Sequence, residues 1–205
     1  MNIHIGIDEA GKGSWAGSVY AAIVILDESQ RSMLHVQGVT DSKKLSVKQR
    51  KTLYSCIIEH SLFSCIHALD VDIIDKVGIY EATQLVIQEL CSKVPSEYLT
   101  EHFCIDGTFP KLIISDPSGN ILKHTCVVQG DITHTAISAA SILAKVARDN
   151  YMEDTLHKKY PEYQFHKHKG YGTKLHRQLL GQHGACPEHR MSFKPVAQLS
   201  PLLSK

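Results

Sequence analysis

The sequence has 205 residues, six cysteines and a formal net charge of +1. This length suits one domain with a sizeable core, and the scattered cysteines lack the paired spacing of a disulfide framework. The chain shows no secretory signal pattern and no apolar run long enough to span a membrane, so secreted and membrane classes are disfavoured and a cytoplasmic monomer is expected.

Charge is distributed unevenly along the chain. From Lys145 onward there are 11 Lys plus Arg against 5 Asp plus Glu, a local charge of +6, whereas the preceding residues carry 11 against 16, a local charge of −5. Such polarity suits a protein that holds cations at its centre and a polyanion on a flanking surface. Composition alone supports a solvated surface of mixed charge equally well.

Apolar periodicity predicts alternating strands and helices. Residues 2–8 alternate apolar and polar side chains, which predicts a half-buried strand that ends at Asp8, before a glycine-rich turn. Ser46 is expected to cap a helix over residues 47–60. Further strands are expected over residues 18–26, 63–71, 102–106 and 124–128. Further helices are expected over residues 79–94, 133–154 and 173–183, with a basic loop over 155–171.

This alternation predicts an α/β fold in which helices pack on a mixed sheet. One domain is expected over residues 1–205, with a basic C-terminal extension over about 155–205. Functional groups in such sheets collect at strand ends, which is where the candidate residues of this chain fall.

Four acidic residues lie at or just after the ends of expected strands, namely Asp8, Glu9, Asp106 and Asp131. Carboxylate oxygens are typical ligands of Mg²⁺ and Mn²⁺, and a pair of such ions activates water and stabilises the leaving oxygen in phosphodiester cleavage. Adjacent acids repel each other unless a cation compensates them, which favours a metal site at Asp8 and Glu9. Asp131 has an alternative as a helix cap and Asp106 as a turn residue.

Two motifs allow different chemistry. Residues 6–12 fit a G-x-x-x-x-G-K nucleotide loop, but Gly13 stands where a Ser or Thr is needed, and a strand rather than a helix is expected next. His183, Cys186 and His189 have the spacing of zinc ligands without an evident fourth member. Both alternatives are weaker than the four-carboxylate site.

A third motif, residues 166–172, interleaves basic side chains and Tyr171 between glycines. Basic and aromatic side chains together suit contact with a phosphate backbone and stacking on a sugar or base. A solvated basic loop is the alternative.

Seven ordered motifs along the chain resemble the ribonuclease HII family. They are GIDEAGKGSWAG (6–17), DSKKLS (41–46), IDG (105–107), GD (130–131), SAASILAKVARD (138–149), HKGYGT (168–173) and HRMSF (189–193). The resemblance implies a ribonuclease H-like fold and metal-dependent cleavage of RNA in RNA/DNA hybrids and at ribonucleotides embedded in duplex DNA. It further implies cleavage on the 5′ side of the ribonucleotide, leaving a 3′-hydroxyl and a 5′-phosphate.

The resemblance also implies residue roles. It makes the same four acids, Asp8, Glu9, Asp106 and Asp131, the metal-binding catalytic residues. Substrate-binding roles are implied for residues of four motifs: Gly11, Lys12, Gly13, Lys43, Lys145, Arg148 and Tyr171. Of these, the glycine turn grips the backbone at the RNA-to-DNA junction and Tyr171 senses the junction. The family often has Gly-Arg-Gly-Pro where this chain has Gly-Lys-Gly-Ser, and lysine keeps the charge without the bidentate fork.

Other identities remain open at this point. A hybrid-binding module without catalysis would have lost an acid, and none is missing. A ribonuclease HIII is expected to carry an additional N-terminal domain, for which there is no room before Asp8. A nuclease indifferent to ribose is a third alternative. Residues 198–205 contain three leucines but no motif that supports contact with a replication clamp.

Overall fold

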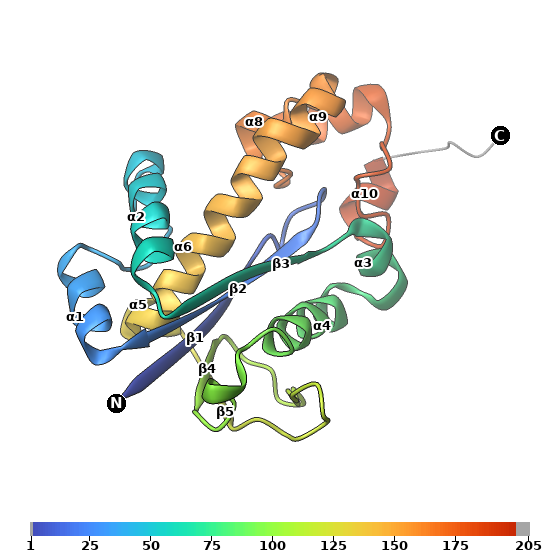
Figure 1. Ribbon diagram of the computed structural model, residues 1–205. Coiled ribbons are helices and arrows are strands. Elements are labelled where there is room, and N and C mark those ends of the chain that lie inside the picture. Colours follow the sequence, from blue (N-terminus) through green and yellow to red (C-terminus); the bar gives the residue numbers. More distant parts are fainter. Residues whose placement is uncertain (1, 200–205) are drawn as a thin grey trace.

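The computed structural model describes residues 2–199, and its centre is a five-stranded sheet in the order β3-β2-β1-β4-β5 (Figure 1). The strands are β1 Ile3–Ala10, β2 Val19–Asp27, β3 Phe63–Leu69, β4 Phe103–Asp106 and β5 His124–Val127. β2 runs antiparallel to β1 and β3, whereas β1, β4 and β5 run parallel. The expected mixed sheet is therefore confirmed.

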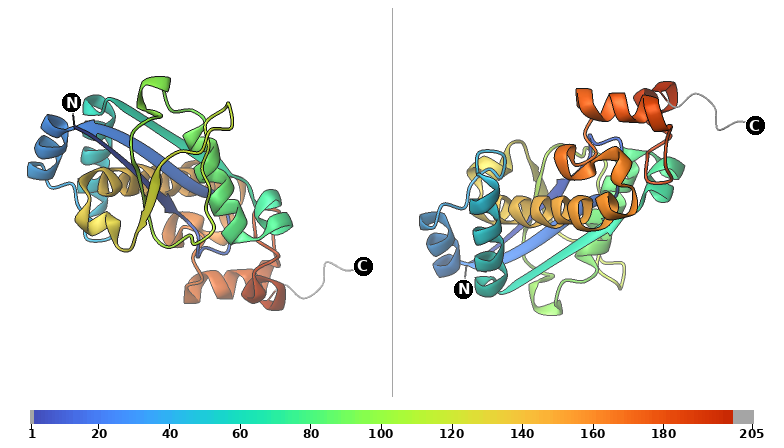
Figure 2. Two further views of the ribbon diagram at one scale, coloured as in Figure 1. Left: turned by 90° about the horizontal axis from the view of Figure 1, so that it is seen from below. Right: turned by 90° about the horizontal axis from the view of Figure 1, so that it is seen from above.

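Helices cover both faces of this sheet. The four longest are α2 Val47–His60, α4 Ile79–Cys91, α6 Thr135–Asn150 and α9 Lys174–His183. The others are α1 Glu28–Val36, α3 Val71–Val77, η1 Ser96–Tyr98, α5 Gly130–Thr133, η2 Tyr151–Leu156, α7 His157–Lys159, η3 Pro161–Tyr163, α8 Phe165–His168 and α10 Lys194–Leu199. α6 crosses one face with α1 and α2 beside it, α4 covers the opposite face, and α8–α10 gather at one end (Figures 1 and 2). No helix among residues 2–199 is long and apolar enough to cross a membrane.

β2 is buried on both faces because alternate side chains enter two different cores. Ile23 and Ile25 pack into the core on the α4 side, whereas Val24 and Leu26 pack into the core under α6. A fully buried aliphatic side chain of this size contributes roughly 1.5–3 kcal/mol to folding. The continuous apolar run of this strand is the sequence signature of burial on both sides.

The structure corrects the expected end of the first strand. β1 continues past Asp8 because it stays paired with β2 as far as Ala10 and Tyr20. Adjacent strand residues point to opposite faces, so Asp8 and Glu9 diverge. Asp8 is buried under α6 and Glu9 is partly exposed.

The long helix expected over residues 133–154 is also corrected. α5 follows β5 directly, and α6 begins only at Thr135 with His134 as its cap residue. Asp131 lies inside α5, so the interpretation of Asp131 as the cap of the long helix is wrong. After Asn150 the chain continues as the π-helical segment η2.

The C-terminal part is more ordered than the expected loop over residues 155–171, because short helices follow one another through this stretch. Its apolar side chains pack on the start of the chain. Ala16 joins one cluster with Met152 and Phe165, and Trp15 joins another with Leu180. The extension is thereby anchored to the residues that follow the glycine turn.

Candidate active site

Three carboxylates from three elements converge at one end of the sheet. The parallel register pairs Ile7 with Ile105, so Asp8 and Asp106 lie one residue further along neighbouring strands and on the same face. Asp131 enters from α5, directly after β5. One carboxylate oxygen from each of the three acids lies within 4.8 Å of the other two. Asp8 and Asp131 are buried, and Asp106 is half-buried.

Backbone hydrogen bonds hold Asp106 and α5 together. Asp106 Oδ1 accepts the amides of Gly130 (2.7 Å) and Asp131 (3.3 Å). The absence of a side chain at Gly130 allows this approach, because a Cβ there would lie 2.5 Å from Ile137 Cδ1 and 3.2 Å from Val127 Cβ. The GD motif therefore lets α5 approach β4 closely enough to bring Asp131 to Asp106.

Burial and mutual repulsion disfavour ionisation of Asp8 and Asp106. Burial raises the pKa of Asp8 well above its usual value, and the charges of Glu9 and Asp106 raise it further. Burial and then the charge of Asp131 raise the pKa of Asp106. A divalent cation would favour the ionised forms, so the donor set fits a hard metal ion. These three acids are the only such cluster among residues 2–199.

Glu9 lies beside this cluster on the other face of β1. Burial raises its pKa, against the opposing effect of Lys12. Lys12 Nζ lies 3.4 Å from Glu9 Oε1 and 4.7 Å from the centre of the Phe109 ring. Its metal-binding role remains a prediction, because Glu9 is not part of the three-carboxylate cluster.

A cavity of about 450 Å³ opens over these acids. Its lining contains nine of the eleven residues selected from the sequence, drawn from five of the seven motifs: Asp8, Glu9, Gly11, Lys12, Gly13, Lys43, Asp106, Lys145 and Tyr171. Asp131 lies beneath the cavity, in contact with Lys43, and Arg148 lies behind its wall. The folding of distant motifs into one cavity indicates a single site.

The DSKKLS motif supplies a lysine and a serine to this cavity. Asp41 Oδ1 accepts the amide of Lys43 (2.9 Å), which shapes the turn, and Lys43 Nζ reaches Asp131 Oδ2 (3.1 Å). The Lys43 side chain is 77% exposed, so it remains accessible to a ligand. Burial lowers the pKa of Lys43, but the hydrogen bond and charge of Asp131 raise it overall.

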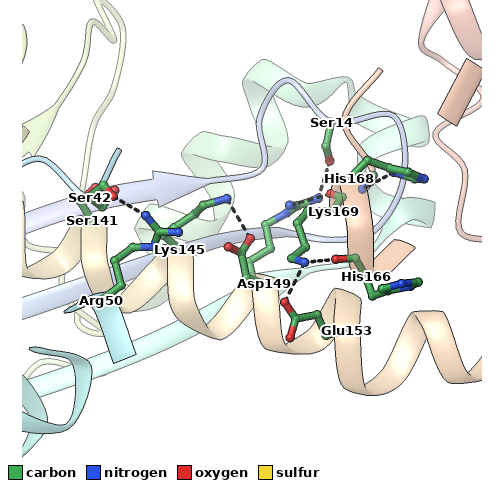
Figure 3. Close-up of polar contacts among 12 residues, drawn as sticks. Ser14, Ser42, Arg50, Ser141, Lys145, Asp149, Glu153, His166, His168 and Lys169 are labelled. Atoms are coloured by element: carbon green, nitrogen blue, oxygen red, sulfur yellow. Dashed lines mark hydrogen bonds and ion pairs between the residues drawn. The ribbon is translucent and has the colours of Figure 1, made fainter. Parts of the chain in front are cut away.

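Two buried serines that sequence reasoning did not select also line the cavity. Ser42 Oγ and Ser141 Oγ lie 2.9 Å apart, and the Ser141 hydroxyl also hydrogen-bonds Asp8. Arg50 Nη1 donates to the Ser42 carbonyl at 2.8 Å (Figure 3). Both serines fall inside quoted motifs, but only tertiary contact shows that they support Asp8.

Arg148 supports the glycine turn from behind. It has no exposed surface, and it donates to Ser14 Oγ (2.5 Å), Ala16 O (3.1 Å) and Lys169 O (3.0 Å). A Cβ at Gly11 would lie 2.0 Å from Arg148 Nε, and Gly11 has φ +92°. Arg148 therefore fixes the turn rather than lining the cavity.

Arg190 holds the same turn and was not selected from the sequence. Its Nη1 donates to Gly11 O (2.8 Å) and Lys12 O (3.2 Å), and its Nη2 donates to Gly17 O (2.7 Å). Arg190 therefore holds the backbone of the turn through its carbonyls. Only the HRMSF motif signalled this residue.

Tyr171 faces the cavity between two glycines that touch the loop after the turn. The Gly170 carbonyl accepts the Trp15 amide at 2.8 Å, and a Cβ at Gly172 would lie 2.3 Å from the Trp15 ring. The Tyr171 ring centre lies 5.4 Å from Lys145 Nζ, which also pairs with Asp149 at 2.8 Å (Figure 3). Tyr171 and the glycine turn are therefore held in one fixed arrangement.

The two alternative chemistries lose their structural basis. The glycine turn leads into the antiparallel strand β2, whereas a nucleotide loop requires a helix at this place. In the zinc alternative, His183 packs edge-on against Tyr163, and both ring nitrogens of His189 already have partners, in Cys186 and His176.

Comparison with known proteins agrees with this geometry. The family model described as ribonuclease HII matches residues 5–196. Ribonuclease HII 1 from Methylibium petroleiphilum is 41% identical over 96% of this chain and 92% of that protein. In fold, the chain resembles ribonuclease H2 from Pyrococcus horikoshii OT3 (TM-score 0.77, 23% identity, 97% of each chain). It also resembles the RNase HII of a PCNA:RNase HII complex from Archaeoglobus fulgidus (TM-score 0.76, 26% identity, 95% of each chain). The chain thus belongs to the ribonuclease HII family, whose members are metal-dependent endonucleases.

Proposed function

We propose that this ribonuclease HII hydrolyses the RNA strand of RNA/DNA hybrids and nicks duplex DNA on the 5′ side of embedded ribonucleotides, leaving a 3′-hydroxyl and a 5′-phosphate. One observation carries the proposal: three carboxylates within 4.8 Å meet beneath a cavity walled by the glycine turn and Tyr171. Such a cavity combines a cation site with groups that contact a sugar-phosphate backbone.

The acids Asp8, Asp106 and Asp131, with Glu9 beside them, would hold Mg²⁺ or Mn²⁺, with two ions engaged during catalysis. Divalent ions bound there supply an activated water and stabilise the leaving oxygen. Lys43 is poised to contact the substrate phosphate, because it is exposed beside Asp131. Lys145 contributes a second positive charge to the cavity lining.

The turn Gly11-Lys12-Gly13 and Tyr171 would recognise the ribose. The 2′-hydroxyl distinguishes RNA from DNA, and recognising it requires hydrogen-bonding groups beside the sugar. Arg190 keeps the backbone of the turn in one shape because it bonds to the carbonyls of Gly11 and Lys12. We assign Arg148, which is fully buried, to positioning of the turn instead of direct phosphate contact.

The proposal is tested with a labelled duplex that contains one ribonucleotide, beside an all-DNA duplex of the same sequence. Nicking is expected only on the ribonucleotide strand and only with divalent metal. Asp131→Asn should reduce kcat by more than about 100-fold. Mutating a residue that only hydrogen-bonds a metal ligand already costs about 10- to 100-fold in metal affinity or activity. Asp154→Asn is the matched control, since Asp154 is 69% exposed and remote from the cavity lining.

Three outcomes would contradict parts of this proposal. Robust activity in Asp131→Asn with unchanged metal affinity would remove Asp131 from the site. Binding of hybrid without metal-dependent nicking would indicate a binding module. Equal cleavage of the all-DNA duplex would indicate a nuclease indifferent to ribose.

The remaining proposals concern the setting of the enzyme. We propose that residues 1–205 act as one monomeric domain in the cytoplasm, supported by six free cysteines and by packing of the C-terminal extension on Trp15 and Ala16. Contact with a replication clamp has a precedent in the Archaeoglobus complex. Of the segment considered for it, residues 200–205 lie outside the described residues.

A further inference from the structure

Three histidines are buried beneath Tyr171, in the C-terminal extension. They are His168 from α8, His176 from α9 and His189 from the loop before α10, with exposed fractions of 6%, 0% and 1%. The rings of His168 and His176 stack with centres 4.3 Å apart. None of the three reaches the cavity lining, so the proposed reaction leaves them without a role.

The backbone dictates the proton positions of His189 and His176. The amide of Cys186 donates to His189 Nδ1 at 3.0 Å, so Nδ1 is an acceptor and the neutral ring carries its proton on Nε2. His189 Nε2 lies 3.0 Å from His176 Nε2, which must then accept. The proton of His176 is therefore on Nδ1, and it points to the carbonyl of Tyr171 at 3.1 Å.

The chain of hydrogen bonds requires neutral rings, and burial keeps them neutral. Burial lowers the pKa of His176 to about 3 and that of His189 to about 4. His168 has a separate partner set, because its Nδ1 accepts the Gly170 amide at 3.2 Å and its Nε2 donates to Tyr163 O at 2.8 Å. Only the His189–His176 pair ends on Tyr171.

We propose that His189 and His176 form a directed hydrogen-bond relay, from the Cys186 amide to the Tyr171 carbonyl, that positions Tyr171 for recognition of the ribonucleotide. The inference rests on the proposed function, in which Tyr171 contacts the substrate. The Tyr171 carbonyl also accepts the Thr173 amide at 2.7 Å, so among residues 2–199 His176 supplies the one bond to it from outside the local turn. His176 and His189 are positioning residues, since neither lines the cavity.

The first test is spectroscopic and independent of activity. Histidine labelled with ¹⁵N in the wild-type protein distinguishes the two neutral tautomers by the chemical shifts of the ring nitrogens. His189 should be protonated on Nε2 and His176 on Nδ1 at neutral pH. A charged His176, or a His176 protonated on Nε2, would overturn the relay.

The second test compares two isosteres at one position. In His176→Asn the amide NH₂ occupies the place of Nδ1 and keeps the bond to Tyr171, whereas His176→Gln places its amide toward His189 and loses that bond. Both remove a buried ring, so similar losses of thermal stability are expected. On a duplex with one ribonucleotide, kcat/KM should fall about 10-fold further in His176→Gln, the effect of one hydrogen bond. Equal activity of the two variants would contradict the proposal.

A double-mutant cycle with Tyr171→Ala separates positioning from general damage. If His176 acts through Tyr171, His176→Gln should cost far less activity in the Tyr171→Ala background than in the wild type. Additive losses would overturn the inference while leaving the proposed function intact. If the wild-type enzyme does not nick the ribonucleotide duplex with divalent metal, the proposed function fails and the inference fails with it.

Discussion

Lys12 stands at the position where the resemblance to the ribonuclease HII family leads us to expect an arginine. In the structure its ammonium faces Glu9 Oε1 (3.4 Å) and the Phe109 ring. Arg190 holds the backbone of the turn independently of this side chain, because it donates to the carbonyls of Gly11 and Lys12. Lysine therefore supplies charge at the site, and the backbone supplies the shape.

A substitution series at Lys12 tests this division. Lys12→Arg should change kcat/KM by less than about 3-fold, since the charge is kept, and Lys12→Met should weaken substrate binding by roughly 3- to 10-fold. If Lys12 contacts a phosphate, Lys12→Met should also lower the slope of log Kd against log salt by about 1. A large gain in Lys12→Arg would show instead that the arginine fork matters.

Ser141 is the residue in the site that only the tertiary structure revealed as a partner of Asp8. Ser141→Ala should weaken metal binding about 10-fold, because it removes a hydrogen bond that orients a metal ligand. Calorimetric titration with Mn²⁺ measures this directly. Ser92→Ala, at the exposed end of α4, is the control. Unchanged metal affinity in Ser141→Ala would place its role in local packing alone.

Among the secondary-structure elements, the arrangement that matters most is the contact between the segment around Tyr171 and the loop after the glycine turn. Gly170 has φ +79°, and a Cβ there would lie 2.6 Å from the Ala16 carbonyl. The π-helical segment η2 places Met152 beneath the same loop, where a Cβ at Gly17 would lie 2.6 Å from its sulfur. Close packing of this kind requires glycine at several positions of two separate motifs.

Two glycines near α9 form a matched pair for testing this contact. Gly172→Ala should destabilise the protein by about 1–3 kcal/mol, because its Cβ would meet the buried Trp15 ring. Gly181→Ala, inside α9 with open space around it, should raise stability by up to about 1 kcal/mol through helix propensity. Urea unfolding of both variants measures the difference. Equal effects would show that the Trp15 ring shifts to accommodate the added methyl group at little cost.

For the molecule as a whole, the buried histidines predict acid sensitivity. His176 and His189 have pKa values lowered by burial to about 3 and about 4, so the unfolded chain binds protons below about pH 6.5 that the folded chain does not. Stability should therefore be fully present above about pH 6.5 and fall toward pH 4, by roughly 1.4 kcal/mol per pH unit for each histidine.

Urea unfolding in EDTA across this pH range tests the prediction. The raised pKa values of Asp8, Glu9 and Asp106 act in the opposite direction, because protonation of these acids at low pH stabilises the folded protein. His176→Asn isolates the histidine contribution, since it should reduce the slope of unfolding free energy against pH while the acids stay unchanged. A variant with the same slope as the wild type would show that His176 titrates normally.

Strong local signals explain how much of this protein was predictable from its sequence. The cap at Ser46, the apolar run of β2 and the strand pattern of residues 63–71 are local, and the structure contains each of them close to its expected place. The end of β1, the break between α5 and α6 and the π-helical η2 depend on partners far away in the chain. Local periodicity gives no information about those distant partners.

The sequence by itself determined the α/β class and the family and singled out four candidate acids, because residue type and spacing suffice for these. Only the tertiary structure showed that three of the acids converge within 4.8 Å, that Glu9 points to the other face and that Arg148 lies behind the turn. It also revealed Ser141, Arg190 and the histidine relay. Convergence depends on strand register and on helices that cross the sheet, and these are set by packing between residues far apart in sequence.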